Sequence, residues 1–355
     1  MDSKKIALII ITLLIVGVIF YLESQKVSPQ EGAGIAKVAC LSNSQKESKF
    51  DCYEEISTPD GFINVESLEI GDLIGQKVVL VDFWTYSCIN CQRTQPYLNA
   101  WYEKYNDQGL KIIGIHTPEF EFEKKYENVL AAAKSAGIEY PVILDNDFST
   151  WRAYKNRYWP RKYLIDIDGY IIYDHIGEGG YEETERKIQE ALEERKEVLK
   201  MEDEISKDIA TPKGVITPDS SKVRSPEVYF GAARNEYLAN GQSGATGVQS
   251  FTTPREISPN ALYLVGDWDI NSESARSASN NSKIIFYYNA KNVYMVASSE
   301  KGVSVNILND GEVVKTVTVK NETLYPIIEN SDYGGQLLEI EIPEAGLEVF
   351  TFTFG

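Results

Sequence analysis

Cations are scarce in this 355-residue chain: 35 lysines and arginines stand against 53 aspartates and glutamates, and the formal net charge is −18 at pH 7. Such an acidic chain repels a phosphate backbone, so we expect no nucleic-acid partner. Histidine occurs twice and cysteine four times. Because His116 and His175 stand alone and only one pair of cysteines is closely spaced, the sequence lacks the second ligand pair of a zinc site, and we expect no bound metal. The remaining composition, 43% hydrophobic and 25% charged, excludes collagen-like, mucin-like and wholly disordered chains.

Charge is absent altogether from residues 6–22, a run rich in Ile, Leu and Val. As a helix this run is about 25 Å long, just enough to cross a bilayer. A cleavable signal peptide has a shorter apolar core and ends at a small-x-small site, whereas this run leads directly into Glu23. The sequence therefore predicts one uncleaved transmembrane helix within residues 1–25, with a buried core helix as the alternative. Lys4 and Lys5 precede it, which predicts a cytoplasmic N-terminus and places the rest of the chain outside the cytoplasm, at the cell membrane.

The rest of the chain divides into four segments of different pattern. Residues 26–49 have little hydrophobic periodicity and suit a tether. Residues 50–207 alternate buried-strand runs with helical patterns, which indicates an α/β layer with a partly parallel sheet. Residues 208–225 read as an extended linker, and residues 226–355 hold short β-rich runs between turns, the pattern of an all-β jelly-roll sandwich. We expect this sandwich to fold independently and to act in positioning or partner binding, since no cysteine follows Cys91.

Two cysteines, Cys88 and Cys91, form a Cys-x-x-Cys motif after the buried-strand run and at the start of a predicted helix. Unpaired backbone N–H groups and the helix dipole favour an anion at that position. Cys88 is therefore expected to be the exposed attacking sulfur, and Cys91 the buried one that closes a redox-active disulfide with it, so that no further cofactor is needed. A purely structural disulfide is disfavoured because so short a loop constrains little of the unfolded chain. Cys40 and Cys52 could also pair outside the cytoplasm, and the sequence leaves both states open.

Several segments carry a family resemblance: VVLVDFWTYSCINCQRTQPYLNAWYEKY, GIHTPEF and WPRKYLIDIDGYI. They resemble the thioredoxin superfamily, and in particular the extracytoplasmic thioredoxin-like domain of DipZ-type proteins within the TlpA-like group. The resemblance covers about residues 60–355. It implies an α/β thioredoxin fold with thiol:disulfide oxidoreductase activity, followed by a sandwich similar to carbohydrate-binding modules. DipZ-type proteins usually carry their own electron-importing membrane domain, so a chain with a single anchor implies a separate membrane electron donor of the CcdA/DsbD type.

The resemblance also implies roles for single residues. Asp82, on the strand before the motif, matches the thioredoxin carboxylate that assists proton transfer from the resolving cysteine, and burial raises a carboxyl pKa toward neutrality. Pro160 matches the cis-proline that faces the disulfide, and Trp159 before it is expected to offer backbone hydrogen bonds to a substrate chain. Glu119 falls where TlpA-like reductases place an acidic group, with a surface glutamate as the alternative. Tyr86 is expected to wall the site.

Together these features predict a membrane-anchored, extracytoplasmic thiol:disulfide oxidoreductase that reduces disulfide-containing exported proteins, or apocytochrome during cytochrome c biogenesis. Two alternatives stay open. Thr85, three residues before Cys88, stands where peroxidases of this fold have a threonine, so a thiol peroxidase-like or oxidising enzyme is one. The other is a glycan-binding or adhesion protein in which the thioredoxin fold is only a scaffold, with Trp268, Tyr287 and Tyr288 as candidate sugar contacts.

Overall fold

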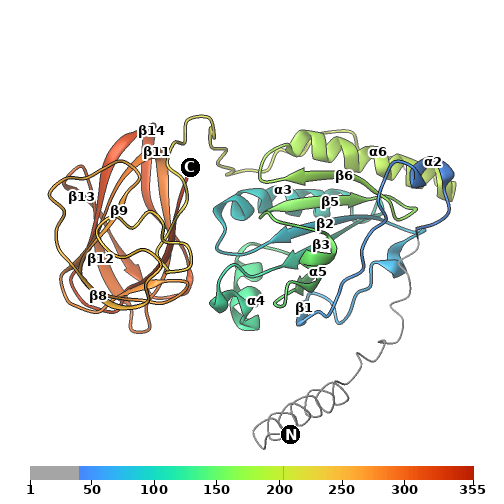
Figure 1. The fold of residues 1–355 in the computed structure, drawn as a ribbon. Helices are drawn as coiled ribbons and strands as arrows, with labels where there is room; N and C mark the ends of the chain where they lie inside the picture. Colours follow the sequence, from blue (N-terminus) through green and yellow to red (C-terminus); the bar gives the residue numbers. More distant parts are fainter. Residues whose placement is uncertain (1–39, 203) are drawn as a thin grey trace, which may run out of the picture. The chain divides into compact units, whose positions relative to one another are not determined.

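The first of two sheets is built around strand β2, the run VVLVDFW, in which all seven residues are buried. Its six strands follow the order β1-β4-β3-β2-β5-β6 (Figure 1). β2 pairs in parallel with β3 and antiparallel with β5, so the sheet is mixed, as the alternating sequence pattern predicted. The strands are β1 (Gly61–Ile63), β2 (Val78–Trp84), β3 (Leu110–His116), β4 (Val142–Leu144), β5 (Arg161–Ile165) and β6 (Ile171–Ile176).

The computed structural model describes residues 40–202 and 204–355, which form a single compact unit. The predicted membrane anchor lies outside these residues. Among the residues that are described, no helix is long and apolar enough to cross a membrane.

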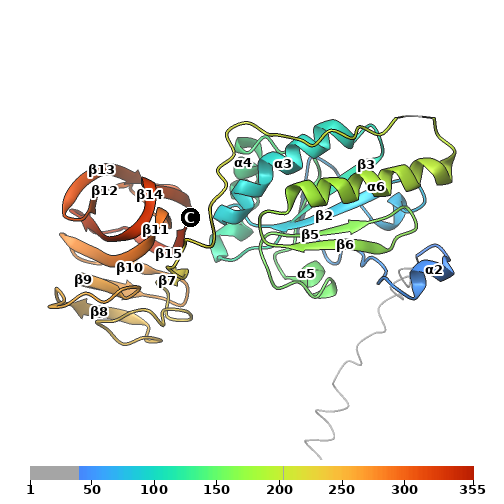
Figure 2. The same cartoon turned by 90° about the horizontal axis from the view of Figure 1, so that it is seen from above.

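Helices cover both faces of the first sheet. They are α2 (Ser44–Glu47), α3 (Ile89–Tyr105), α4 (Tyr126–Ser135), α5 (Ser149–Ala153) and α6 (Tyr181–Leu199), with 3-10 turns η1 (Gly71–Leu73) and η2 (Glu121–Lys124). Because side chains alternate along a strand, Leu80 of β2 packs in one cluster with Leu98 of α3 and Leu192 of α6. Phe83 belongs to the other face and meets Trp151 of α5 edge-on at 5.8 Å. Figures 1 and 2 show α3 and α6 on one side of the sheet and α5 on the other.

The second sheet is all-β and antiparallel, as the turn-rich C-terminal pattern predicted. Its strands run in the order β13-β12-β14-β11-β15-β10-β9-β8, with β7 paired to β15. They are β7 (Val228–Tyr229), β8 (Gly247–Phe251), β9 (Leu262–Ile270), β10 (Ala275–Ser277), β11 (Ser282–Ser298), β12 (Val303–Asn309), β13 (Glu312–Val319), β14 (Thr323–Ile342) and β15 (Glu348–Phe354). Trp268 and Tyr288 are fully buried in its core, which removes both as candidate sugar contacts, whereas Tyr287 is half-buried.

Each sheet has its own hydrophobic core, but the two cores meet at one interface. Tyr294, Val296, Leu324 and Phe350 of the second sheet are buried in the hydrophobic cluster that includes α3 and β2. This packing hides apolar side chains of each part from water, so the two parts are in close contact, and the independent folding of residues 226–355 stays a prediction.

The segment that leads into the first sheet is closed by a disulfide and is held to the rest of the domain by the ion pairs of a lysine. Cys40 and Cys52 form a disulfide, which decides the pairing that the sequence left open. The ammonium group of Lys46 lies 2.6 Å from Asp166, 2.9 Å from Asp168 and 2.6 Å from Glu194. These three carboxylates have the mutual spacing of a metal site, but the lysine already supplies the positive charge that would hold them together.

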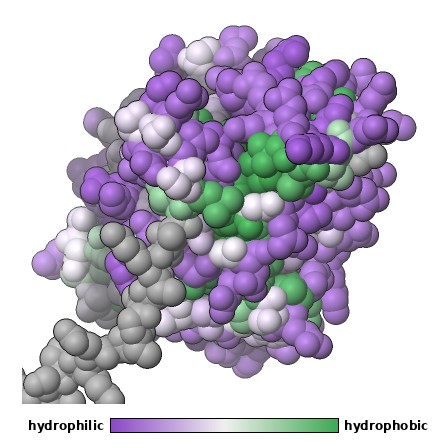
Figure 3. Space-filling model, turned by 90° about the vertical axis from the view of Figure 1, so that its right-hand side faces the viewer, coloured by the Kyte–Doolittle hydropathy of each residue, from purple (hydrophilic) through white to green (hydrophobic). Residues whose placement is uncertain are grey.

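The surface carries the charge that the composition predicts. Figure 3 shows one face of the molecule, where hydrophilic side chains surround a smaller patch of hydrophobic ones. Exposed ion pairs such as Arg186–Glu182 on α6 add at most about 1 kcal/mol each. The fold therefore depends on the buried clusters rather than on its surface charges.

Candidate active site

Cys88 occupies the position before the first turn of α3. It is the N-cap residue of that helix, and the backbone N–H of Cys91 donates to its sulfur at 3.4 Å. Cys88 is half-buried, Cys91 is buried, and both are unpaired thiols. The Cys91 N–H and the positive end of the helix dipole lie at the Cys88 sulfur, which suits this sulfur to attack a disulfide.

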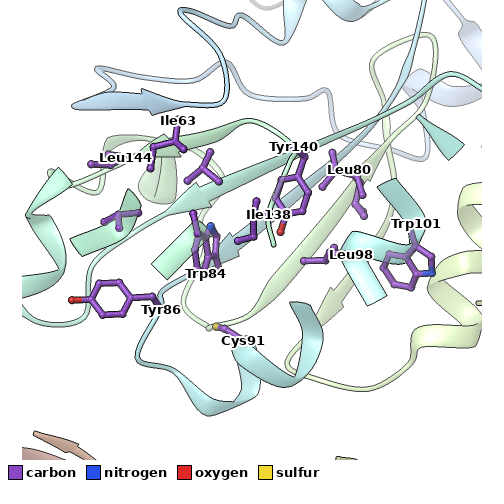
Figure 4. Packing of buried hydrophobic residues seen from close by; sticks show 14 of the residues in the cluster. Ile63, Leu80, Trp84, Tyr86, Cys91, Leu98, Trp101, Ile138, Tyr140 and Leu144 are labelled. Carbon is purple, nitrogen blue, oxygen red and sulfur yellow. The ribbon is translucent and has the colours of Figure 1, made fainter. Parts of the chain in front are cut away.

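Cys91 lies one turn further on, against Trp84 and other core side chains (Figure 4). Burial and the neighbouring Cys88 and Asp82 raise the pKa of its thiol well above the usual value. A resolving cysteine of this kind stays protonated at neutral pH and needs a base before it can attack.

Asp82 is the candidate for this base. Its side chain is buried on β2, one of its carboxylate oxygens has no hydrogen-bond partner among the described residues, and burial raises the pKa of its carboxyl to about 7. A carboxyl with that pKa can accept a proton near neutral pH, so the structure places it as the resemblance implied.

Lys162 is a site residue that the sequence reasoning missed. It stands opposite Asp82 in the β2–β5 register and is fully buried, and its ammonium group donates to the carbonyl of Gly177 at 3.3 Å. Its positive charge lowers the pKa of Asp82 against the effect of burial. The signal in the sequence was a lysine that directly precedes the run Tyr163–Ile165 in the strand after Pro160.

The peptide bond between Trp159 and Pro160 is cis, as the resemblance implied. The Cys88 thiol points at the carbonyl oxygen of Trp159, 3.9 Å away. The indole of Trp159 is held aside, since its N–H donates to the carbonyl of Thr117 at 3.0 Å and its ring packs on Trp151. The large side chain therefore leaves the backbone of residue 159 beside the attacking sulfur.

Tyr86 and Glu123 shape the loop before Cys88. Tyr86 is buried and stacks on His116 at 5.8 Å, so it packs at the base of the loop and borders a cavity that also reaches Cys91. Glu123, another residue that the sequence reasoning missed, is fully buried and accepts hydrogen bonds from the backbone N–H and the hydroxyl of Ser87, at 3.2 and 2.7 Å. Its second oxygen accepts from the N–H groups of Glu119 and Phe120, at 2.6 and 3.1 Å. No local pattern distinguishes it from the neighbouring acidic residues.

Glu119 meets the second sheet. Its carboxylate accepts hydrogen bonds from the Tyr229 hydroxyl at 2.9 Å and from the Arg234 guanidinium at 2.8 Å. The three residues border a cavity of about 370 Å³ that also contains Cys88 and Trp159. Glu119 is therefore beside the attacking cysteine, as predicted, but its partners come from the sandwich, which had been expected to stay out of the site.

Two family profiles match this chain. Residues 55–174 match the AhpC/TSA family, and residues 225–355 match a family described as the thioredoxin like C-terminal domain. Among curated proteins, the thiol-disulfide oxidoreductase YkuV of Bacillus subtilis is 30% identical over 122 residues, which are 34% of this chain and 82% of YkuV. The chain belongs to the thioredoxin superfamily.

DipZ of Mycobacterium tuberculosis is a longer relative of this thioredoxin-superfamily chain. The two are 37% identical over 281 residues, which are 79% of this chain and 39% of DipZ. The chain therefore spans about two fifths of the length of that relative. Among solved structures, a thiol-disulfide isomerase from Corynebacterium glutamicum has 22% identity and a TM-score of 0.36, with 41% of this chain and 97% of that chain covered.

Six of the seven site residues that were named from the sequence lie close together in this thioredoxin-superfamily chain. Cys88, Trp159 and Glu119 border the cavity, Pro160 follows Trp159, and Cys91 and Asp82 lie behind Cys88. Tyr86 lies on the opposite side of the motif. The arrangement provides a nucleophilic sulfur, a second sulfur within reach and a base, which are the parts that thiol–disulfide exchange requires.

Proposed function

We propose that this chain is a thiol:disulfide oxidoreductase that uses Cys88 and Cys91 to reduce disulfides outside the cytoplasm, where the sequence run at residues 6–22 anchors it to the membrane. The observation that carries the proposal is the position of Cys88 as N-cap of α3, where its sulfur accepts a hydrogen bond from the backbone N–H of the buried Cys91. Relatives named as thiol-disulfide oxidoreductases, YkuV and ResA, support the reaction class.

The reaction has two exchange steps. The Cys88 thiolate attacks one sulfur of the substrate disulfide, the substrate S–S bond breaks, and the departing substrate sulfur leaves as a thiolate that takes a proton from water. Asp82 then accepts the proton of Cys91, whose sulfur attacks Cys88. This second step releases the other substrate thiol and leaves a Cys88–Cys91 disulfide, so two electrons have passed to the substrate.

The oxidised pair must be reduced again for another cycle. We assign that role to a separate membrane donor of the CcdA/DsbD type, because the described residues contain no second redox-active cysteine pair. Exported proteins with disulfides, or apocytochrome cysteines, are the proposed substrates.

The position of Thr85 does not favour the peroxidase alternative. Thr85 is fully buried and its hydroxyl lies 3.4 Å from Nε2 of His116, so the hydroxyl is engaged in the core, while the backbone carbonyl of Thr85 accepts from the N–H of Cys88 at 3.4 Å. This position supports exchange chemistry over peroxide reduction. The scaffold alternative is likewise weakened, since two of its three candidate sugar contacts are buried.

The direction of the reaction is tested by the reduction potential of the Cys88–Cys91 pair. The protein is equilibrated with glutathione buffers of stated ratio, quenched with acid, alkylated and weighed by mass spectrometry. A reductant is expected to titrate below about −230 mV, near thioredoxin, whereas a value near about −120 mV, as in DsbA, would make the protein an oxidant and overturn the proposal.

A further inference from the structure

The cavity around Cys88 has two walls from different parts of the chain. The thioredoxin side contributes Cys88, Glu119 and Trp159 among others, and the C-terminal part contributes a wall that includes Glu227, Tyr229 and Arg234. In an open groove only the first wall would be present. The sandwich therefore changes what can approach the attacking sulfur.

An aromatic contact holds the second wall in place. Phe350 of β15 packs against two rings of the segment after β3, with ring centroids 5.2 Å from Phe120 and 4.8 Å from Phe122. All three side chains are buried. Contacts of this kind are typical of a domain core rather than of a loose domain contact, so the sandwich is fixed over the site.

Polar contacts flank this aromatic contact. Arg234 bonds to Glu119 and stacks on the ring of Tyr229, with its guanidinium carbon 3.6 Å from the ring centroid. Elsewhere in the interface, Glu322 accepts from the Lys125 ammonium and the Asn128 amide, both at 2.8 Å.

The Arg234–Glu119 contact is linked by hydrogen bonds to the active-site loop. The backbone N–H of Glu119 donates to Glu123, and Glu123 in turn accepts from Ser87, the residue before Cys88. A sandwich residue is thus joined to the nucleophile's loop through a continuous series of hydrogen bonds.

We propose that the sandwich is a substrate gate: Phe350 and Arg234 hold it over Cys88, so that the enzyme reduces disulfides in extended, unfolded polypeptide segments and excludes those on folded proteins. This inference rests on the proposed oxidoreductase function and adds the substrate class. An extended segment can enter a cavity of about 370 Å³ and lie along the Trp159 backbone, whereas a folded surface would collide with the sandwich.

Three substrates test the gate on the intact chain: a ten-residue peptide with one internal disulfide, folded insulin, and 2-hydroxyethyl disulfide as a small reporter of the chemistry. We expect kcat/KM for the peptide to exceed that for insulin by at least about tenfold. Equal rates on peptide and insulin would overturn the gate. No reduction of any of the three, reporter included, would overturn the oxidoreductase proposal and this inference with it.

Opening the interface should admit the folded substrate. Phe350→Asp places a charge against the rings of Phe120 and Phe122. The double variant Arg234→Glu with Glu322→Lys puts like charges opposite Glu119 and Lys125 while changing only partly exposed side chains. Each is expected to raise kcat/KM on insulin by at least about tenfold relative to that on the reporter. If Phe350→Asp does not fold by circular dichroism, the double variant decides.

The matched control is Glu341→Lys. Glu341 pairs with Lys283 at 2.9 Å within the sandwich, so this variant makes the same charge reversal as Glu322→Lys but outside the interface. The insulin-to-reporter ratio should stay at the wild-type value. An unchanged ratio in the double variant, or the same rise in the control, would contradict the gate.

Discussion

Asp82 and Lys162 face each other across the β2–β5 pairing with both side chains buried. Burial raises the pKa of Asp82 to about 7 and lowers the pKa of Lys162, and the charge of each group opposes the effect of burial on the other. The pair lies behind Cys91, whose thiol must lose a proton before the second exchange step. The structure thus places two groups of opposite charge where one proton has to move.

Asp82→Asn should slow the attack of Cys91 on the mixed disulfide. The carboxylate is the active form of the base, so the wild-type rate should rise with pH through about 7, and the asparagine variant should lose this rise and be slower by roughly 10- to 100-fold at pH 7.5. The predicted pH dependence is checked by stopped-flow measurement of mixed-disulfide decay between about pH 5 and 9, a range that brackets a base of this pKa. A wild-type-like pH profile would return Asp82 to a structural role.

The stability of the same variant separates a chemical effect from misfolding. The folded-state pKa of Asp82 lies above the ordinary value of 3.8, so the folded protein retains a proton that the unfolded chain has lost, and wild-type stability falls as pH rises from about 4 to about 7. Asp82→Asn removes this loss. At pH 8 it should be more stable than wild type by about 1–4 kcal/mol in urea unfolding, with the difference absent near pH 3.

Lys162→Met should shift the rate profile to higher pH. Without the buried ammonium group, nothing offsets the effect of burial on Asp82, its pKa rises further, and less of the base is ionised at pH 7. We expect the midpoint of mixed-disulfide decay to move upward by about one pH unit, with Lys162→Arg closer to wild type. A reduced rate with an unshifted midpoint would contradict this role.

The two cysteines should behave differently when replaced singly. Cys91→Ser keeps the sulfur at the helix start and should accumulate a mixed disulfide with a substrate peptide, whereas Cys88→Ser leaves only the buried thiol and should trap nothing. Non-reducing electrophoresis and intact-mass analysis distinguish the two. Trapping by Cys88→Ser would reverse the assignment of attacking and resolving sulfur.

Glu123→Gln should destabilise the loop before Cys88. The amide nitrogen of glutamine cannot accept from backbone N–H groups, so donors of Ser87 or Glu119 lose their partner in a buried site, at about 1–3 kcal/mol in thermal or urea unfolding. Glu121→Gln, two residues earlier and with a side chain 72% exposed, is the control and should change stability by less than about 0.5 kcal/mol. Equal losses of stability in the two variants would show that the hydrogen bonds of Glu123 do not stabilise the loop before Cys88.

The predicted topology is open to a direct test. If Lys4 and Lys5 keep the N-terminus in the cytoplasm, protease added to intact cells should remove the part of the chain after residue 22. Immunoblotting against the sandwich reads the result, with a cytoplasmic protein as the control for sealed membranes. Full protection would contradict the extracytoplasmic location.

Local sequence patterns were sufficient to predict the part of the site that is made of consecutive residues. The run VVLVDFW, the turn and the helix that begins with Cys88 are consecutive in the chain, so strand, nucleophile and buried partner follow from short-range hydrophobic periodicity and helix capping. The cis-proline and Asp82 came from the family resemblance, because nothing in their immediate neighbours indicates a role. Lys162 and Glu123 were missed because a buried charge is recognisable only once its partners are known.

By itself the sequence determined two regions of different pattern, a thioredoxin-like layer and an all-β C-terminal part, and a Cys-x-x-Cys pair poised at a helix start. Tertiary structure alone decided that Lys162 faces Asp82 and that Arg234 reaches Glu119 across 115 residues of chain. It also decided that Phe350 packs into the first core rather than its own. The reason is physical: periodicity records which side chains avoid water, whereas their partners depend on how distant segments pack, and that packing put a wall of the sandwich beside Cys88.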